Sequence, residues 1–270
     1  MADNWYEAAF GSHYPLLYAH RDQEEAQRSL ALLDRLVPLD RTPGSRILDL
    51  GCGDGRHLEL LSGEGCETVG LDLSDELLRF ARDRGHGASE PRLVRGDMRC
   101  LPFAAGSFTA VLSLFTAFGY FGPPSANRDP IREISGVLAP QGHWYLDYFD
   151  GDKVRDELGT GEHKVRVREL GPISVKEERW FKEEESVVCK NVELVPVPGK
   201  EAEAAILSIQ PAGLAYTEEV AVFTLDQLKE LAALEGLELV TSAGGYEGQS
   251  LGQGSRWILI FRKNAKALKI

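Results

Sequence analysis

The sequence lacks any long hydrophobic run: its apolar segments are strand-sized, well short of the roughly 20 residues that span a bilayer. It also lacks the features of a secretory signal, because the first residues, MADNWYEAAFGSHY, contain neither a basic leader nor an apolar core. We therefore expect no membrane segment and predict a cytoplasmic protein.

Cysteine is scarce and scattered. The four cysteines form no C-x-x-C pair, and no histidine cluster stands at ligand spacing beside them. This distribution argues against a zinc site and against a disulfide framework. We expect reduced, mostly buried thiols and no metal.

Basic residues are outnumbered: 30 Lys and Arg stand against 42 Asp and Glu, a formal net charge of -12. Nucleic-acid affinity depends on neutralising phosphates with Lys and Arg, so a large nucleic acid is not expected as a partner. An acidic protein can still hold a local basic patch. The hydrophobic fraction of 43% and the length of 270 residues are ample for the core of an enzyme.

Strand and helix patterns alternate along the first half of the chain. Residues 22–37 read as an amphipathic helix with Asp22 as its cap, and apolar strands are expected at 46–50, 68–73 and 108–115. Further strands are expected near 93–94 and over 143–148, with helical patterns between the strands. This alternation predicts an α/β fold, a doubly wound and mostly parallel sheet with helices on both faces.

Over residues 152–220 the sequence changes to short segments in which apolar and polar residues alternate, interrupted by prolines. This pattern predicts an antiparallel β insertion. A helix after Thr224 and two final strands then return to the first pattern. We therefore divide the chain into an N-terminal helical cap, 1–40, a nucleotide-binding type of domain, 41–151 with 221–270, and the inserted segment. We expect that segment to wall an acceptor pocket or to form a dimer contact.

The stretch RILDLGCGDGR, residues 46–56, places an acid ahead of three glycines at a strand-to-helix turn. A dinucleotide-binding fingerprint has the spacing G-x-G-x-x-G, whereas this loop has G-x-G-x-G with Arg56 in place of the last glycine. Asp49 would repel a pyrophosphate but suits a cationic ligand such as S-adenosylmethionine. Asp72, at the end of the next strand, is placed to accept from both hydroxyls of a ribose.

Five segments in order resemble the motifs of class I S-adenosylmethionine-dependent methyltransferases, in particular the bacterial small-molecule branch. They are LDLGCGDGR, GLDLS, RGDMRCLPF, FTAVLSLFTAFGYF and VLAPQGHWYLDYF. The resemblance covers residues 14–150 well and the closing YEGQSLGQGSRWILIFRK more loosely, and Ala-Pro-Gln-Gly at 139–142 replaces a commoner Pro-Gly-Gly turn. It implies a Rossmann-like sheet whose last strand is antiparallel, with S-adenosylmethionine as the cofactor.

The resemblance also implies which residues contact the cofactor. The methionine moiety would be lined by Asp49, Gly51, Cys52 and Gly53. Asp72 would hold the ribose, and the adenine would be contacted by Leu73, Asp97 and Met98.

Two further groups of residues follow from the same resemblance. Leu114 and Phe115 would flank the sulfonium. The N-terminal segment of the family often covers the cofactor, which makes Tyr14, Tyr18 and Arg21 candidates, with Arg21 facing the carboxylate.

Methyl transfer needs a general base only when the acceptor must lose a proton. Candidates for a base or an orienting group, none preferred, are His20, Tyr120, Asp147 and Tyr148. The leading hypothesis is transfer to an oxygen or a nitrogen, less so to carbon or sulfur, of a small molecule by a monomer or homodimer. The alternatives are a non-catalytic cofactor-binding module and an enzyme of the same fold with another reaction, such as an aminopropyl transferase or a nicotinamide-dependent reductase.

Overall fold

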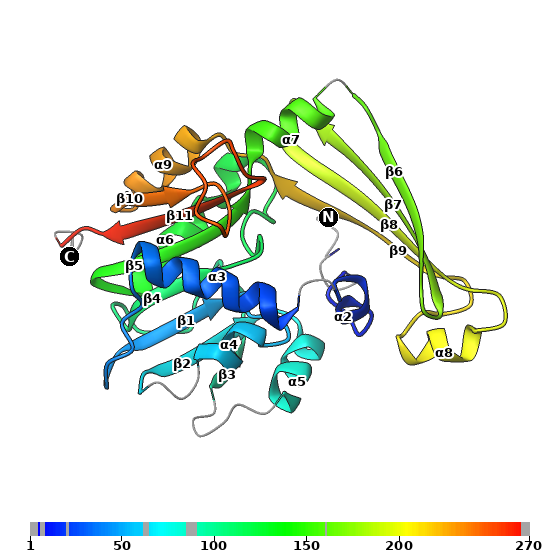
Figure 1. Ribbon diagram of the computed structural model, residues 1–270, viewed down its shortest axis with the longest axis horizontal. Helices are drawn as coiled ribbons and strands as arrows, with labels where there is room; N and C mark the ends of the chain where they lie inside the picture. Colours follow the sequence, from blue (N-terminus) through cyan, green and yellow to red (C-terminus); the bar gives the residue numbers. More distant parts are fainter. Residues whose placement is uncertain are drawn as a thin grey trace.

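The computed structural model describes residues 5, 9–19, 22–61, 65–84, 91–159 and 161–265. Within them lie a seven-stranded sheet and a separate four-stranded sheet (Figure 1). The order of the larger sheet is β10-β11-β5-β4-β1-β2-β3. Its strands are β1 (Arg46–Leu50), β2 (Glu67–Asp72), β3 (Arg92–Arg95), β4 (Phe108–Ser113), β5 (Leu138–Phe149), β10 (Leu237–Ala243) and β11 (Arg256–Lys263).

Parallel ladders join β1, β2, β3, β4 and β5, and β11 runs antiparallel to both of its neighbours. The prediction of a mostly parallel sheet with an antiparallel last strand is confirmed. The expected strand over 108–115 ends at Ser113, because the next positions turn the chain: Phe115 and Thr116 have φ angles of 54° and 62°. Those angles lie outside the β region.

Helices cover both faces of the large sheet, as the apolar strands require. On one face α6 (Arg128–Val137) and α9 (Leu225–Leu234) pack against Leu48 and Leu50 of β1. On the other, α3 (Gln23–Leu36) and α4 (Arg56–Leu61) pack with Ile47. The helix α5 (Asp75–Asp83) follows β2, and the short 3-10 helix η1 (Pro124–Asn127) precedes α6.

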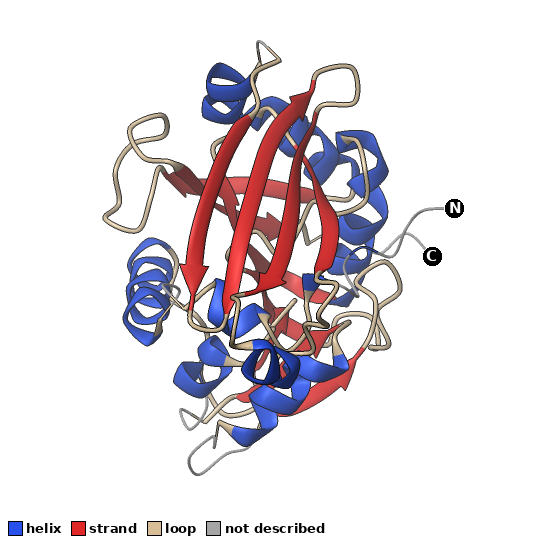
Figure 2. Cartoon of the chain, turned by 90° about the vertical axis from the view of Figure 1, so that its right-hand side faces the viewer, coloured by secondary structure: helices blue, strands red, loops and turns tan. Residues whose placement is uncertain are grey.

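The four-stranded sheet is an antiparallel meander in the order β6-β7-β8-β9 (Figure 2). Its strands are β6 (Lys164–Leu170), β7 (Ile173–Lys182), β8 (Val187–Pro196) and β9 (Leu214–Ala221), with α8 (Glu201–Ile206) between the last two. The predicted β insertion is thereby confirmed. The helix α2 (Tyr14–Leu17) lies between the two sheets (Figure 1), and its Leu17 packs with Ile173 and Leu194 of the smaller one.

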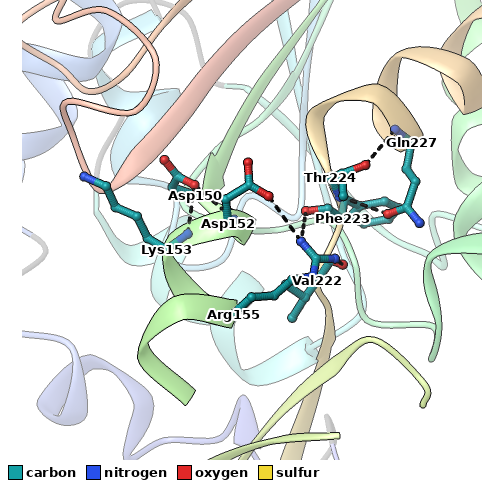
Figure 3. A network of polar contacts seen from close by, with 8 residues as sticks. All are labelled: Asp150, Asp152, Lys153, Arg155, Val222, Phe223, Thr224 and Gln227. Carbon is teal, nitrogen blue, oxygen red and sulfur yellow. Dashed lines mark hydrogen bonds and ion pairs between the residues drawn. The ribbon is translucent and has the colours of Figure 1, made fainter. Parts of the chain in front are cut away.

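Polar contacts fix the place where the chain leaves the large sheet and returns to it (Figure 3). The helix α7 (Gly151–Leu158) is capped by Asp150, whose Oδ1 accepts from two backbone N–H groups of its first turn. Arg155 donates to the carbonyl oxygens of Val222 and Phe223. A capping box between Thr224 and Gln227 then starts α9. These contacts tie the exit and the return of the inserted segment to each other.

Candidate functional site

A first cavity opens at the C-terminal ends of β1, β2 and β4, with an empty volume of about 940 Å³ that includes open solvent. This is the place where open α/β sheets bind ligands. The residues that sequence reasoning assigned to the cofactor and that line this cavity are Tyr14, Asp49, Gly51, Cys52, Gly53, Asp72, Leu73, Asp97, Met98, Leu114 and Phe115.

The glycine loop brings backbone close to this cavity. Gly51 has a φ of 79°, and a Cβ there would stand 2.7 Å from the Cβ of Ala117. The backbone N–H groups of Gly51 and Cys52 both donate to the carbonyl of Leu71, which fixes the loop on β2. Burial raises the pKa of the Cys52 thiol well above its ordinary value, so this cysteine is an unreactive small side chain rather than a nucleophile.

Asp49 lies at the bottom of the cavity with 1% of its surface exposed. Its Oδ2 has no hydrogen-bond partner among the described residues, and burial raises the pKa of its carboxyl to about 7. The nearest cationic candidate is His57, with Nδ1 at 4.0 Å, but burial lowers the pKa of that imidazole well below 6.5. The histidine of this pair is therefore uncharged, and the charge of Arg56, which lines the same cavity, only partly opposes the effect of burial on the carboxyl of Asp49.

Asp72 is the last residue of β2, and its side chain accepts hydrogen bonds from the backbone of two neighbouring loops. Its Oδ2 accepts from the N–H of Gly53 and its Oδ1 from the N–H of Ser74, both at 2.8 Å. Burial raises the pKa of this carboxyl, and hydrogen bonds from the backbone of Ser74, Gly53 and Leu73 oppose that shift. A carboxylate has about four acceptor positions, so these three donors leave it able to accept from a ligand.

Asp97 also lines the cavity, but Arg99 pairs with it, Nη2 to Oδ2 at 2.6 Å. The hydrogen bonds from Arg99 lower the pKa of this carboxyl, which is therefore ionised. Phe115 also lines the cavity, and the guanidinium of Arg56 lies 4.3 Å from its ring centroid. An orphaned buried carboxyl oxygen, a second carboxylate and an apolar wall together fit a cationic ligand with a ribose and a flat ring, as S-adenosylmethionine has.

The candidate bases end up in different places. Tyr120 lines the first cavity, whereas His20 lies outside the described residues, as does the cofactor candidate Arg21. Asp147 is 1% exposed and fully occupied: it accepts from Phe115 N, Tyr246 Oη and Arg256 Nε. Tyr148 is completely buried, with its hydroxyl bonded to the carbonyl of Ala221. The structure thus brings neither Asp147 nor Tyr148 to a cavity.

Asp147 has a different use, which sequence reasoning did not foresee. Its side chain and its carbonyl accept from the N–H groups of Phe115 and Thr116, which are two of the five non-glycine residues with positive φ in the described part of the chain. Such conformations cost of order 1–3 kcal/mol each and persist only when their surroundings hold them. Arg256 contributes by donating to Thr116 Oγ1 at 3.1 Å. The buried pair therefore positions the wall of the cavity.

A second cavity, with an empty volume of about 1840 Å³ that includes open solvent, lies against the four-stranded sheet. It shares Phe10, Tyr14, Phe115 and Tyr120 with the first cavity, so the two spaces meet at these rings. Sequence reasoning missed this cavity's basic lining, because the residues come from separate strands. They are Lys164, Arg166, Arg168, Arg179, Lys190 and Arg256, beside the acids Glu177 and Glu218.

The predicted cofactor residue Tyr18 lines this second cavity rather than the first. Lys190 Nζ donates to Tyr18 Oη at 2.6 Å, and Tyr18 Oη donates to Glu218 Oε1 at 3.2 Å. Lys190 also pairs with Glu218 Oε2 at 2.7 Å. This network attaches the end of α2 to β8 and β9 at the boundary between the cavities.

The described part of the chain lacks two further features. No group of three or more His, Cys, Asp or Glu side chains there could hold a metal ion. None of the helices found there is long and apolar enough to cross a membrane.

Comparisons with known proteins agree on one family. A family model described as a methyltransferase domain matches residues 47–142. The chain is 34% identical over 177 residues to the dTDP-3-amino-3,4,6-trideoxy-alpha-D-glucopyranose N,N-dimethyltransferase of Streptomyces venezuelae, over 60% of this chain and 72% of the relative. It is 25% identical over 259 residues to the dTDP-3-amino-3,6-dideoxy-alpha-D-glucopyranose N,N-dimethyltransferase of Streptomyces fradiae, over 92% and 91%.

A solved structure agrees in fold. It is that of an S-adenosylmethionine-dependent methyltransferase from Clostridium acetobutylicum, with a TM-score of 0.75 and 15% identity over 93% of this chain and 96% of that chain. At this identity the similarity concerns the fold alone.

Proposed function

This chain belongs to the S-adenosylmethionine-dependent methyltransferases, and on that premise we propose that it methylates the amino group of an amino sugar. It is an enzyme of small-molecule methylation with S-adenosylmethionine as its cofactor. Two relatives are N,N-dimethyltransferases of amino sugars, and this supports the choice of acceptor.

We assign the first cavity to the cofactor. The unpaired Oδ2 of Asp49 would receive the ammonium of its methionine moiety, and Asp72 the ribose hydroxyls. Asp97 would accept from the adenine amino group, with Leu73 and Met98 against the ring. Gly51, Cys52 and Gly53 would line the methionine moiety, and Leu114 and Phe115 would flank the sulfur.

The bound cofactor supplies a methyl group that is already activated, so the chain mainly has to align the acceptor and exclude water. Orientation of this kind is worth up to about 7–11 kcal/mol. The rings shared by both cavities, from Phe10, Tyr14, Phe115 and Tyr120, form the dry boundary at which acceptor and donor would meet. We assign Tyr120 to orienting the acceptor, because it is the base candidate that lines both spaces.

The composition of the second cavity favours nitrogen over oxygen. A hydroxyl must lose its proton to a base during attack, whereas a neutral amine attacks through its free lone pair. The described lining holds no histidine, and its two carboxylates are engaged: Glu218 with Lys190, and Glu177 with Arg168 at 3.5 Å. This scarcity of free bases is the observation on which the assignment to an amine depends.

The test is methyl transfer from tritium-labelled S-adenosylmethionine to a pair of sugars that differ only in an amino or a hydroxyl group at one carbon. We expect label in the amino sugar, with one or two added methyl groups by mass spectrometry, and none in the hydroxy sugar. Label in the hydroxy sugar alone would refute the proposal, and binding of the cofactor without transfer to either would refute the acceptor class.

A further inference from the structure

A buried histidine, His57 on α4, lines the cofactor cavity but has no role in the proposed function so far. It is 4% exposed, and its ring centroid lies 5.2 Å from that of Phe115. Its Nε2 lies 3.5 Å from the hydroxyl of Ser29 on α3, the helix beside α4 (Figure 1). Its Nδ1 lies 4.0 Å from Oδ2 of Asp49. The imidazole therefore stands between a helix on one face of the sheet and the buried carboxyl of the cavity.

The hydroxyl of Ser29 determines which nitrogen of His57 carries the proton. Ser29 donates its only hydroxyl hydrogen to the carbonyl oxygen of Ala26 at 2.8 Å, so towards His57 it can only accept. Burial lowers the pKa of the imidazole well below 6.5, so the ring is neutral and carries a single proton. That proton is on Nε2, and Nδ1 keeps its lone pair on the side of Asp49.

Nδ1 of His57 and Oδ2 of Asp49 are thus two acceptors with no hydrogen shared between them. Their separation of 4.0 Å exceeds the length of a hydrogen bond, so even a protonated Asp49 does not bond to the histidine. Oδ2 of Asp49 has no other hydrogen-bond partner among the described residues. A ligand atom that carries at least two hydrogens would satisfy both acceptors at once.

An ammonium group fits between these two atoms. With a hydrogen bond of about 2.9 Å to each acceptor, the two bonds would meet at the nitrogen at roughly 90°, not far from the tetrahedral angle between its hydrogens. A neutral histidine adds an acceptor without adding a positive charge that would repel the ammonium. A hydroxyl has only one hydrogen and could donate to only one of the two atoms.

We propose that His57 is the second acceptor, beside Asp49, for the ammonium of the cofactor's methionine moiety, and that Ser29 is a positioning residue that holds His57 in the required tautomer. His57 touches the cofactor, whereas Ser29 acts only through His57. This inference rests on the proposed function in one respect, the place of the ammonium at Asp49. The identity of the methyl acceptor does not enter it.

The test compares, by calorimetry on the full chain, the affinities for S-adenosylhomocysteine and for its deamino analogue, which lacks only the ammonium. His57→Phe keeps a ring beside Phe115 but removes the acceptor. We expect this variant to bind S-adenosylhomocysteine about tenfold or more weakly, and the deamino analogue as tightly as the wild type does. Ser29→Ala should show the same selective loss, about two- to fivefold.

His143→Phe is the matched control, because His143 is on β5 and lines neither cavity, so it should change neither affinity. Unchanged affinity for S-adenosylhomocysteine in His57→Phe would overturn the proposal. An equal loss for both ligands would also overturn it, because it would show that the histidine only supports the fold. A selective loss in His57→Phe with none in Ser29→Ala would overturn the role of Ser29.

Asp49→Asn separates this proposal from the one on which it rests. If that variant loses the preference for S-adenosylhomocysteine over the deamino analogue while His57→Phe keeps it, the role of His57 fails and the place of the ammonium at Asp49 stands. Equal affinity of the wild type for both ligands would refute the ammonium site as a whole. Transfer to the amino sugar is measured separately and reports on the acceptor alone.

Discussion

At the scale of single residues, two buried carboxyl groups have opposite uses. Asp49 keeps one oxygen without a partner, and burial raises the pKa of its carboxyl to about 7. Asp147 is equally buried but fully bonded, and its ion pair with Arg256 holds the backbone of Phe115 and Thr116. The first group is available to a ligand, whereas the second is part of the framework.

The pKa of Asp49 leads to a prediction about pH. Because its carboxyl has a pKa of about 7 in the folded protein and 3.8 as the ordinary value, folding takes up a proton between these values, and stability falls as pH rises through that window. A cationic ligand favours the ionised form. Affinity for S-adenosylmethionine should therefore fall, by up to about tenfold per pH unit, as pH drops below about 7.

Calorimetry at about pH 5.5 and about pH 7 measures this dependence, and Asp49→Asn provides the control because an amide does not titrate. The variant should bind more weakly at about pH 7 and show little change between the two conditions. An identical slope in wild type and variant would show that another group titrates.

At the scale of elements, a few contacts decide how the inserted sheet is attached. Asp150 starts α7 as its cap, and Gly151 is needed because a Cβ there would stand 2.0 Å from the carbonyl oxygen of Phe223. Arg155, one turn later, bonds the carbonyls at the return of the chain. These contacts fix where the chain leaves and rejoins the large sheet, and thereby where the second cavity lies relative to the first.

We predict that Arg155→Met lowers the free energy of unfolding by roughly 1–3 kcal/mol, because it leaves the carbonyls of Val222 and Phe223 without their donor. Chemical denaturation measures the change. Arg132→Met is the control: that residue is exposed and forms an ion pair with Asp129 one turn away, so its loss should cost about 0.5 kcal/mol or less. Equal effects in the two variants would contradict the proposed attachment.

At the scale of the whole molecule, α2 connects the two halves of the site. Tyr14 lines both cavities, and Tyr18 is bonded to Lys190 and Glu218 of the smaller sheet. The helix is only four residues long, and its Leu17 packs with residues of the smaller sheet. Its position therefore depends on the inserted sheet, although it borders the cofactor cavity.

We accordingly expect Tyr18→Phe to weaken cofactor binding and to raise the KM of the acceptor together, each by about two- to tenfold, as befits one lost hydrogen bond. Calorimetry and steady-state kinetics give the two values. Tyr145→Phe loses a comparable hydroxyl contact, to the carbonyl of Val37 at 3.1 Å, away from both cavities and should change neither. No change in Tyr18→Phe would show that the two halves act independently.

Local sequence patterns were enough to predict the parallel sheet, the glycine loop and the acids at the ends of β1 and β2. These features depend on residues that are close in the chain. Apolar runs define strands, and Asp49 and Gly51 are two residues apart. The alternating segments of residues 152–220 also predicted an antiparallel insertion. The roles of the individual cofactor residues remain predictions.

Tertiary structure alone decided which polar residues face a cavity. Asp147 and Tyr148 occupy a strand end, as catalytic groups often do. Asp147 is nevertheless bonded to Tyr246, 99 residues away along the chain, and Tyr148 to Ala221, 73 residues away. The basic lining of the second cavity likewise exists only because four strands pair in one register. A sequence specifies its own periodicity locally, but the neighbours across a ladder are set by long-range pairing, and it is those neighbours that give this site its charge.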